Sequence, residues 1–363
     1  MHTRLFPKGH RFHEGVFFET RTESLCVETD LIMKLSIVIL CWNDLKVIVN
    51  CLESIYAGTH STEFEVIVSD NGSSDESVNV IRQRFPRVHL IENGTNLRFA
   101  KANNVGIRAS NGEYILILNP DTIIHDGTLD KLVMFADKHA EAGAFGCRVL
   151  NPDGTYQVSG RPFATLRGEW IAALYLRPLG YFSRWFLSDS YIGWKGETPR
   201  KVDWLSGCFI LIRSDLAKRL GGFDEQFFYY YEDMDLCRRV WEAGYSIIYT
   251  PEMTITHLGG QSTKHSPRAF ALDGQITRYR YYYKYFGKRG ARGCRRVKLV
   301  SLFLRRLGYG LLQLVNPSDA RKSRLETLRL TIEWNMLVNP VQLVENGEEP
   351  KVTVEPMGRV LER

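Results

Sequence analysis

Carboxylate side chains gather in an aromatic segment of this sequence, FFYYYEDMDLCRR, which begins at residue 227. Glu232 and Asp233 directly follow five aromatic residues, where water is expected to be scarce. A carboxylate with an ordinary pKa near about 3.9 is ionised at neutral pH and can take a proton from an attacking hydroxyl, and an apolar environment raises its pKa. The segment therefore indicates a general base or, in the simpler interpretation, acidic residues that stabilise a helix N-terminus.

Two further carboxylates lie at the ends of apolar runs. Asp70 closes the run VIVSD, and Asp121 closes LILNPD, in which Pro120 keeps Asn119 extended and ends the run abruptly. If both runs are strands of one sheet, their carboxyl ends share an edge, and the two carboxylates could hold a divalent cation together with a diphosphate. Each residue alone is also compatible with a structural turn, and Asp70 also suits a hydrogen bond from a nucleotide base or ribose.

Basic and imidazole groups elsewhere in the chain could contact phosphate. Arg98 and Lys101 lie at the start of a predicted helix, whose N-terminal amides favour anions. His257 precedes Gly259 and Gly260, which leave room for a ligand. The simpler interpretations are surface charge for the two basic residues and a structural role for the histidine, unless a diphosphate or its metal ion lies nearby.

Short apolar runs alternate with helical patterns from residue 35 to about residue 150. Strands are predicted at 35–41, 64–69, 88–92 and 114–118, and helices at 44–56, 75–84, 100–110 and 127–139. Further strands are predicted at 202–213 and 245–249, with a helix at 233–243 between them. The alternation predicts an α/β fold, in which helices cover both faces of a Rossmann-like, mostly parallel sheet and ligands bind at the carboxyl ends of its strands.

Charge and cysteine usage restrict the partners. The net charge of +6 is too weak to indicate nucleic acid, but it suits anionic ligands or an anionic membrane surface. The seven cysteines are scattered and mostly lie in apolar runs, which is typical of reduced cysteines in a cytoplasmic protein. Residues 297–315 are apolar but interrupted by Arg305 and Arg306. This pattern favours either an interfacial helix on the inner face of the cell membrane or an ordinary amphipathic helix packed on the core.

Several motifs occur together in one order, namely SIVILCWN, VSDNGSSD, NLRFAKANN, LILNPD, VDWLSGCFILIR, FYYYEDMDLCRR and THLGGQS. As a set they resemble the motifs of glycosyltransferase family 2, whose members are inverting enzymes of the GT-A fold, and especially its bacterial rhamnosyltransferase-like branch. The resemblance covers roughly residues 35 to 265. It implies Mg²⁺ or Mn²⁺, a nucleotide-sugar donor such as dTDP-rhamnose or a UDP-sugar, and a glycan or lipid-linked acceptor in bacterial cell-surface polysaccharide synthesis.

The resemblance also implies roles for residues at matching motif positions. Asp233 would be the base, with Glu232 beside it, and Asp121 and His257 would hold the metal. The implied donor-binding residues are Asp70, Asn71, Asn96, Arg98, Asn103, Asn119 and His257, and those facing the acceptor are Trp204, Ser206 and Gly207. The chain departs from the family pattern at Asn119, which replaces the first Asp of the metal motif, and at Arg98 and Lys101, which lie in a loop that is glycine-rich in many relatives.

The expected reaction is a single in-line displacement with inversion, because one base and no protein nucleophile take part. Residues 1–32 are expected to be a disordered upstream extension, since a strand follows Met33 directly. The expected domains are a glycosyltransferase domain at 33–265, with a nucleotide-binding half at 33–150 and an acceptor and catalytic half at 151–265, and a helical basic region at 266–363.

Two other functions remain open on the residues alone. A nucleotidyltransferase would need a glycine-rich, basic triphosphate loop after the first strand, where this chain has CWNDLK. A non-catalytic nucleotide-sugar binding module would not need both Glu232 and Asp233.

Overall fold

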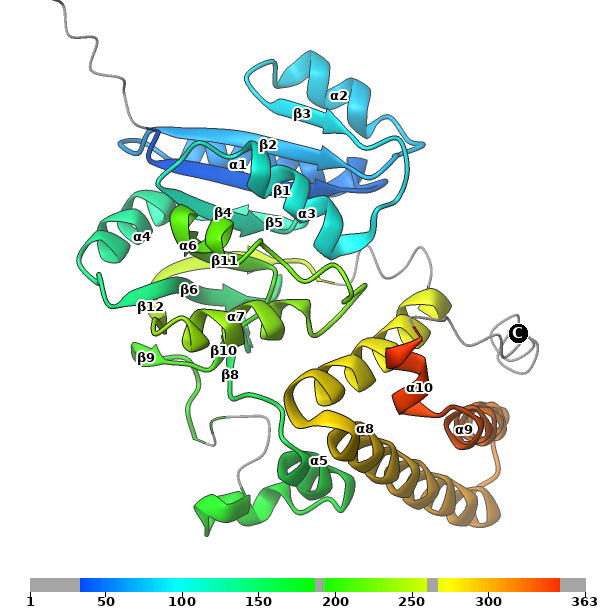
Figure 1. Cartoon of the computed structure of the whole chain (residues 1–363). Coiled ribbons are helices and arrows are strands. Elements are labelled where there is room, and N and C mark those ends of the chain that lie inside the picture. The colour runs from blue at the N-terminus through cyan, green and yellow to red at the C-terminus, as the bar shows by residue number, and fades with distance from the viewer. Residues whose placement is uncertain (1–32, 187–190, 192, 260–266, 347–363) are drawn as a thin grey trace, which may run out of the picture. The chain divides into compact units, whose positions relative to one another are not determined.

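A computed structural model describes residues 33–186, 191, 193–259 and 267–346 (Figure 1). The expected disordered extension at residues 1–32 lies outside the described residues. The proposed domain boundary between residues 265 and 266 also falls on residues outside that set and stays a prediction.

The first half of the fold is a parallel sheet of four strands, as the alternating pattern predicts. Its strands are β1 (Leu35–Cys41), β2 (Phe64–Asp70), β3 (His89–Glu92) and β4 (Tyr114–Leu118), in the order β3-β2-β1-β4. Its helices are α1 (Leu45–Gly58), α2 (Ser77–Arg84), α3 (Arg98–Ala109) and α4 (Thr128–Asp137). The register pairs Cys41 with Asp70 and Ile39 with Leu118, so the carboxyl ends of β2, β1 and β4 are level at one edge.

The second half extends the same sheet with strands of mixed direction. Strand β11 (Phe209–Arg213) runs antiparallel to β4 and to β6 (Ala142–Leu150), while β12 (Ser246–His257) is parallel to β6 and antiparallel to β5 (Thr122–Ile124). The smaller elements are β7 (Tyr156–Gln157), β8 (Gly160–Arg161), β9 (Arg200–Lys201), β10 (Trp204–Leu205) and α6 (Ser214–Arg219). The prediction of one strand over 202–213 is therefore wrong in detail, because a turn separates β10 from β11.

Helices cover both faces of the sheet and bury its apolar side chains. Ile48 of α1 and Leu132 of α4 lie in one buried cluster, and Ile107 of α3 lies in the other with Leu236 of α7 (Glu232–Glu242). Full burial of one such side chain is worth about 1.5–3 kcal/mol. The α/β class, with a mixed, mostly parallel central sheet, is confirmed, and the core fixes the strand ends on which the site is built.

The C-terminal region is helical, as predicted, and packs on the preceding part through α5 and α7 (Figure 1). It comprises α8 (Pro267–Val315), α9 (Asp319–Leu337) and α10 (Pro340–Glu345), and α5 covers Leu166–Ala173. Helix α8 changes direction at Gly287, whose φ of +63° favours glycine. Among the described helices, none is long and apolar enough to cross a bilayer.

Asp235 of α7 is fully buried, and its side chain contacts α8. Its carboxylate lies 2.8 Å from Arg239 Nε and 2.6 Å from Lys284 Nζ, and it accepts a hydrogen bond from the Tyr285 hydroxyl at 2.7 Å. The helical pattern places Asp235 on the polar face of α7, but that face is covered by α8. A buried carboxylate needs such partners, since an unpaired buried charge is costly.

Candidate active site

The sheet edge brings the predicted carboxylates into one row. Asp70 ends β2 and pairs with Cys41 at the end of β1, next to β4 and the following Asp121. On the other side of β4, the Asn119 N–H donates to the Cys208 carbonyl at 3.1 Å. Because neighbouring strands lie about 4.8 Å apart, these groups share one edge of the sheet.

Asp70 forms a turn that leaves one carboxylate oxygen unpaired. Its Oδ2 accepts hydrogen bonds from the amides of Gly72 and Ser73, both at 3.0 Å. Its Oδ1 is buried and has no hydrogen-bond partner among the described residues. Gly72 has φ +73°, and an added Cβ there would lie 3.1 Å from the backbone of Thr95. Buried polar atoms are normally paired, so Oδ1 is suited to a ligand donor such as a nucleoside N–H or hydroxyl.

The predicted donor-binding asparagines hold the start of α3 in place. Asn71 Nδ2 donates to Asn96 Oδ1 at 3.2 Å, and Asn96 Oδ1 also accepts from the Arg98 amide at 2.8 Å. Asn103 Nδ2 donates to the Phe99 carbonyl within α3, while its buried Oδ1 has no partner in the described chain. The structure therefore brings Asn71 and Asn96 together, and Asn103 lies further along the same helix.

Arg98 adopts a backbone conformation that favours glycine. Its φ is +68°, which costs a non-glycine residue free energy. The Arg98 guanidinium lies 4.0 Å from the ring centroid of Phe228, within cation–π distance. Lys101 is exposed on the following turn, in line with the surface interpretation of this residue.

Asp121 and His257 form a close pair that suits a divalent metal. His257 Nε2 lies 3.1 Å from Asp121 Oδ1 and 3.3 Å from Asn119 Nδ2, and both members of the pair are nearly buried. His257 Nδ1 lies 2.7 Å from Gln157 Oε1, and Gln157 Nε2 donates to Asn151 Oδ1 at 3.0 Å. With the ring proton on Nδ1, the Nε2 lone pair faces the carboxylate, an arrangement that a shared cation would satisfy.

This pair supplies only part of a coordination sphere. Over the described ranges, no three His, Cys, Asp or Glu side chains come close enough together to hold a metal ion. Mg²⁺ and Mn²⁺ sites in enzymes that act on nucleotides commonly complete their coordination with phosphate oxygens and water. The pair therefore fits a metal that is held together with a diphosphate.

Asp233 lies at the N-terminus of α7 and is held by backbone amides. Its Oδ2 accepts from the Gly207 amide at 3.0 Å, and its Oδ1 accepts from the Met234 amide at 2.7 Å. Burial nevertheless raises the pKa of Asp233 to about 6. Burial and the Asp233 charge raise the pKa of Glu232 well above its usual range, and Glu232 Oε2 has no partner among the described residues. A carboxylate with a pKa near 6 is ionised at neutral pH and more basic than an ordinary Asp.

The aromatic run before α7 is strained and packs on α8. Tyr230 and Tyr231 both have positive φ, +67° and +68°, which is unusual for two consecutive aromatic residues. Phe227 lies in the buried cluster with Tyr281 of α8, and the Tyr231 and Tyr281 ring centroids are 5.1 Å apart. These contacts fix the direction in which α7 begins, and Glu232 and Asp233 are the first two residues of that helix.

The predicted acceptor segment adjoins Asp233. Gly207 is buried, and a Cβ on it would lie 3.4 Å from Phe99 Cζ and 3.6 Å from Asp233 Oδ2. Trp204 Nε1 donates to the Pro162 carbonyl at 2.9 Å, and the Ser206 amide donates to Ser159. The structure thus brings Gly207 to Asp233. The hydrogen bonds of Trp204 and Ser206 instead connect this segment to residues 159–162.

The sequence analysis did not identify two polar residues at this edge, Asp44 and Gln157. Burial, with Asp121, Asp75 and Asp70 nearby, raises the pKa of Asp44 to about 7. Its position after the end of β1 could have revealed it, because every other strand end in the row carries a polar group. Gln157 had no such signal, since its contact with His257 spans 100 residues of sequence.

A Rossmann-like sheet that carries Asp70, the Asp121–His257 pair and Asp233 along one edge has the architecture of a GT-A glycosyltransferase. A family model described as glycosyl transferase family 2 matches residues 36–221, and the chain belongs to this family.

Curated relatives include the N-acetylglucosaminyl-diphospho-decaprenol L-rhamnosyltransferase of Mycobacterium tuberculosis, 33% identical over 215 residues that cover 56% of this chain and 69% of the relative. Rhamnosyltransferase WbbL of Escherichia coli is 29% identical over 205 residues, covering 53% of this chain and 72% of its own length. Among solved structures, the mannosyltransferase PcManGT of Pyrobaculum calidifontis in complex with GDP-Man and Mn²⁺ aligns with a TM-score of 0.48 and 15% identity, over 87% of this chain and 88% of that one.

Proposed function

We propose that this protein transfers a sugar from a nucleoside diphosphate to an acceptor hydroxyl with inversion, using Asp233 as the general base. The observation that carries the proposal is that two hydrogen bonds of adjacent residues, Gly207 and Cys208, connect Asp233 to the strand that leads to Asp121. The Gly207 amide binds Asp233, and the carbonyl of the next residue, Cys208, binds the amide of Asn119, two residues before Asp121. The base and the metal ligands are therefore positioned by one stretch of backbone.

In this mechanism, Asp233 accepts the proton of the acceptor hydroxyl as that hydroxyl attacks the anomeric carbon. Asp70 Oδ1 binds the nucleoside, and the Asn71–Asn96 network fixes the start of α3 beside it. Asp121 and His257 would hold a divalent cation, which when bound offsets negative charge on the departing nucleoside diphosphate. Gln157 keeps the His257 Nε2 lone pair directed toward that position.

The relatives suggest the substrates. Rhamnose is named for the donors of both rhamnosyltransferases, and a diphospho-decaprenol lipid for the acceptor of the mycobacterial one. We infer dTDP-rhamnose, with UDP-sugars as the second candidate, and a lipid-linked diphosphate acceptor. The setting is cell-surface glycan synthesis at the cytoplasmic face of the membrane.

Purified protein with Mn²⁺, dTDP-rhamnose and a short-chain lipid-linked GlcNAc diphosphate is expected to release dTDP and form a disaccharide product, which mass spectrometry detects. UDP-GlcNAc and GDP-mannose serve as alternative donors. Release of pyrophosphate from a nucleoside triphosphate and a sugar phosphate would instead indicate a nucleotidyltransferase. Donor binding with neither transfer nor hydrolysis would indicate a binding module.

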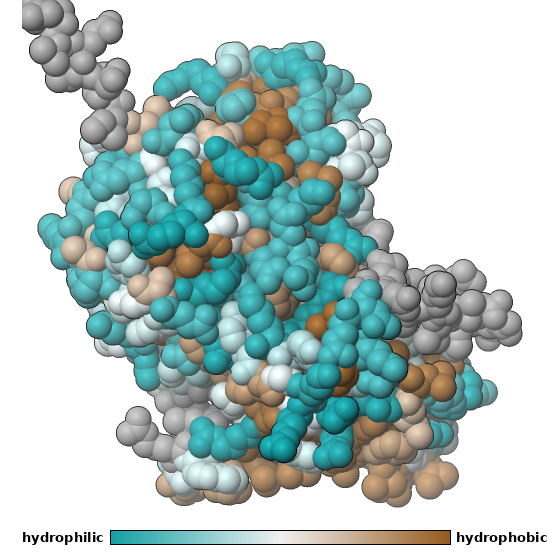
Figure 2. Space-filling model, in the orientation of Figure 1, coloured by the Kyte–Doolittle hydropathy of each residue, from teal (hydrophilic) through white to brown (hydrophobic). Residues whose placement is uncertain are grey.

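A membrane surface is the second proposed partner, and it concerns the end of the molecule formed by α5, the following short helices and α8. Figure 2 shows apolar residues gathered along this lower margin. Exposed apolar residues occur in the two short 3-10 helices, Arg177–Tyr181 and Arg184–Phe186, in the turn between them and in the second half of α8. We name the following set of them the apolar margin: Leu179, Tyr181, Phe182, Trp185, Phe303, Leu307, Leu311 and Leu312. Phe182 is 87% exposed. Arg305 and Arg306 lie in the same part of α8, and aromatic residues combined with cations suit the interface of an anionic bilayer.

The double variant Phe182→Ser, Trp185→Ser is expected to lose binding to vesicles that contain phosphatidylglycerol, because it removes two exposed aromatic anchors. Co-sedimentation at moderate ionic strength measures this loss. Met134→Ser is the matched control, since Met134 is 53% exposed on α4, away from the margin. If the double variant sediments with vesicles as the parent does, the margin is not the membrane-binding surface.

A further inference from the structure

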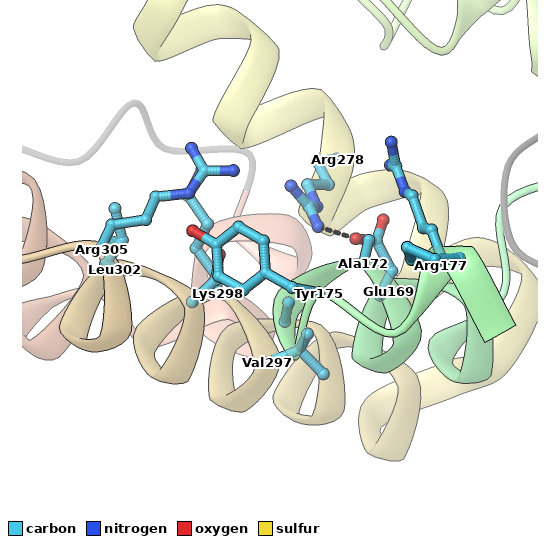
Figure 3. A pocket seen from close by; sticks show the side chains of 12 residues that line it. Glu169, Ala172, Tyr175, Arg177, Arg278, Val297, Lys298, Leu302 and Arg305 are labelled. Carbon is cyan, nitrogen blue, oxygen red and sulfur yellow. Dashed lines mark hydrogen bonds and ion pairs between the residues drawn. The ribbon is translucent and has the colours of Figure 1, made fainter. Parts of the chain in front are cut away.

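A cavity of about 660 Å³ lies between α5, the turn after it and both parts of α8, before and after the bend (Figure 3). Its wall carries four cationic side chains and a single carboxylate. The cations are Arg177, Arg278, Lys298 and Arg305, and the carboxylate is Glu169. Such an excess of positive charge in a concave site attracts anions.

The single carboxylate of the cavity is already occupied. Glu169 forms an ion pair with Arg278, drawn as a dashed line in Figure 3, and its Oε1 accepts a hydrogen bond from the Tyr282 hydroxyl at 3.0 Å. Lys298 and Arg305 have no hydrogen-bond or ion-pair partner within the described part of the chain. Glu169 therefore contacts neither of these two cations directly, although its charge acts on Lys298 from a distance.

The environment of Lys298 is that of a cation lacking its counter-ion. Lys298 is partly buried, and burial together with the charges of Arg278 and Arg305 lowers its pKa to about 8. Holding a cation in this position costs folding free energy. A bound anion would offset that cost, since it would restore the preference of the amine for its charged form.

The mouth of the cavity adjoins the apolar margin. Tyr175 lines the cavity, is 62% exposed and has φ +59°, a conformation that is costly for a tyrosine. Leu302 lines the cavity wall, and the next residue, Phe303, belongs to the margin. An anionic head group could thus enter among the cations while an attached hydrocarbon chain remains against the margin.

The cavity also lies close to the base. The charges of Arg278 and Glu169 both act on the hydroxyl of Tyr231, and Tyr231 directly precedes Glu232 and Asp233. Arg278 and Glu169 of the cavity wall are therefore electrostatically coupled to the residue that precedes α7.

We propose that this cavity binds the diphosphate group of a lipid-linked acceptor, with its hydrocarbon chain on the apolar margin. The inference rests on the proposed function for the identity of the acceptor, and adds the residues that hold it. Lys298 and Arg305 are positioned to contact the diphosphate oxygens, and Arg278 completes the cationic wall. The site is distinct from the Asp121–His257 pair, which faces the donor diphosphate in the proposed mechanism.

Binding of farnesyl diphosphate, measured by calorimetry in EDTA, tests the site without turnover. Lys298→Met and Arg305→Gln are each expected to weaken binding about tenfold or more, because each removes a charge-assisted contact. Arg306→Gln is the matched control, since Arg306 is the exposed neighbour of Arg305 but does not line the cavity. Asp233→Asn should bind like the parent, so loss of the proposed chemistry and loss of this site give different results.

Four outcomes would overturn the proposal. Unchanged binding in both cavity variants would show that the cations do not contact the ligand. An equal loss in Arg306→Gln would indicate attraction by surface charge alone. Equal affinity for inorganic pyrophosphate, or full competition by phosphatidylglycerol vesicles at matched phosphate concentration, would indicate a free-phosphate or bulk phospholipid site instead of an acceptor site.

Discussion

Asp233→Asn is expected to lower the rate of sugar transfer by roughly 10²- to 10⁴-fold while leaving the affinity for the nucleotide-sugar donor nearly unchanged. The amide has the shape of the carboxylate, and its single oxygen can accept the hydrogen bond from either Gly207 or Met234, but it cannot take the acceptor proton. Single-turnover transfer measures the rate, and calorimetry with the donor measures the affinity. Near-parental transfer by this variant would remove Asp233 from the mechanism.

The pH profile provides an independent check on the same residue. The folded pKa of Asp233, about 6, lies above its ordinary value of 3.8, so ionisation is unfavourable in the folded protein and stability from this group falls as pH rises through 6. Transfer by the parent should rise over the same interval, because the ionised form is the base. Asp233→Asn should lose this pH dependence and unfold at no lower temperature than the parent at pH 7. A lower unfolding temperature would mean that its inactivity reflects misfolding.

Asp121→Ala is expected to have the second large effect, a loss of more than about 100-fold in the Mn²⁺-dependent part of donor affinity. Removal of residues that only orient a metal ligand commonly costs 10- to 100-fold, so loss of a direct ligand should exceed that range. Gln157→Leu should give the smaller effect, because it leaves His257 Nδ1 without its acceptor. Calorimetry with nucleoside diphosphate and Mn²⁺ measures both variants.

Asp126→Ala is the control for this series. Asp126 is an exposed carboxylate that pairs with His60. It is close to Asp121 in sequence but is not one of the groups at the sheet edge. The Asp126→Ala variant should leave the Mn²⁺-dependent affinity for nucleoside diphosphate unchanged. Equal Mn²⁺ dependence in the parent and in Asp121→Ala would show that the Asp–His pair does not hold the metal.

The strand ends could be predicted from sequence because their signals are local. Asp70 and Asp121 each follow a continuous apolar run, and parallel register then determines that they share an edge. Strand β6 was missed because Gly143 and Gly146 interrupt its apolar pattern. Both glycines are packing positions, where an added Cβ would lie 2.5 Å from Leu216 and 2.4 Å from Leu205. A glycine that serves close packing cannot be told from one in a turn by local pattern.

The rest of the site depends on contacts between distant segments. Gln157 and His257 meet because β7 follows β6 in a hairpin while β12 runs beside β6, and no short motif records that meeting. Asp235 reads as a solvent-facing residue on the helical pattern of α7, and only the packing of α8 reveals that it is buried. Long-range pairing of this kind is a property of the folded topology.

The buried Asp235 contacts also have a mechanical consequence. Asp235 lies two residues beyond Asp233 on α7, and its bonds to Lys284 and Tyr285 clamp that helix to the segment of α8 just before the bend at Gly287. Beyond the bend, α8 leads to the surface proposed to meet lipid. The Asp235 contacts therefore hold the start of α7 to the near side of the bend, and Gly287 separates them from the part of α8 that is proposed to meet lipid.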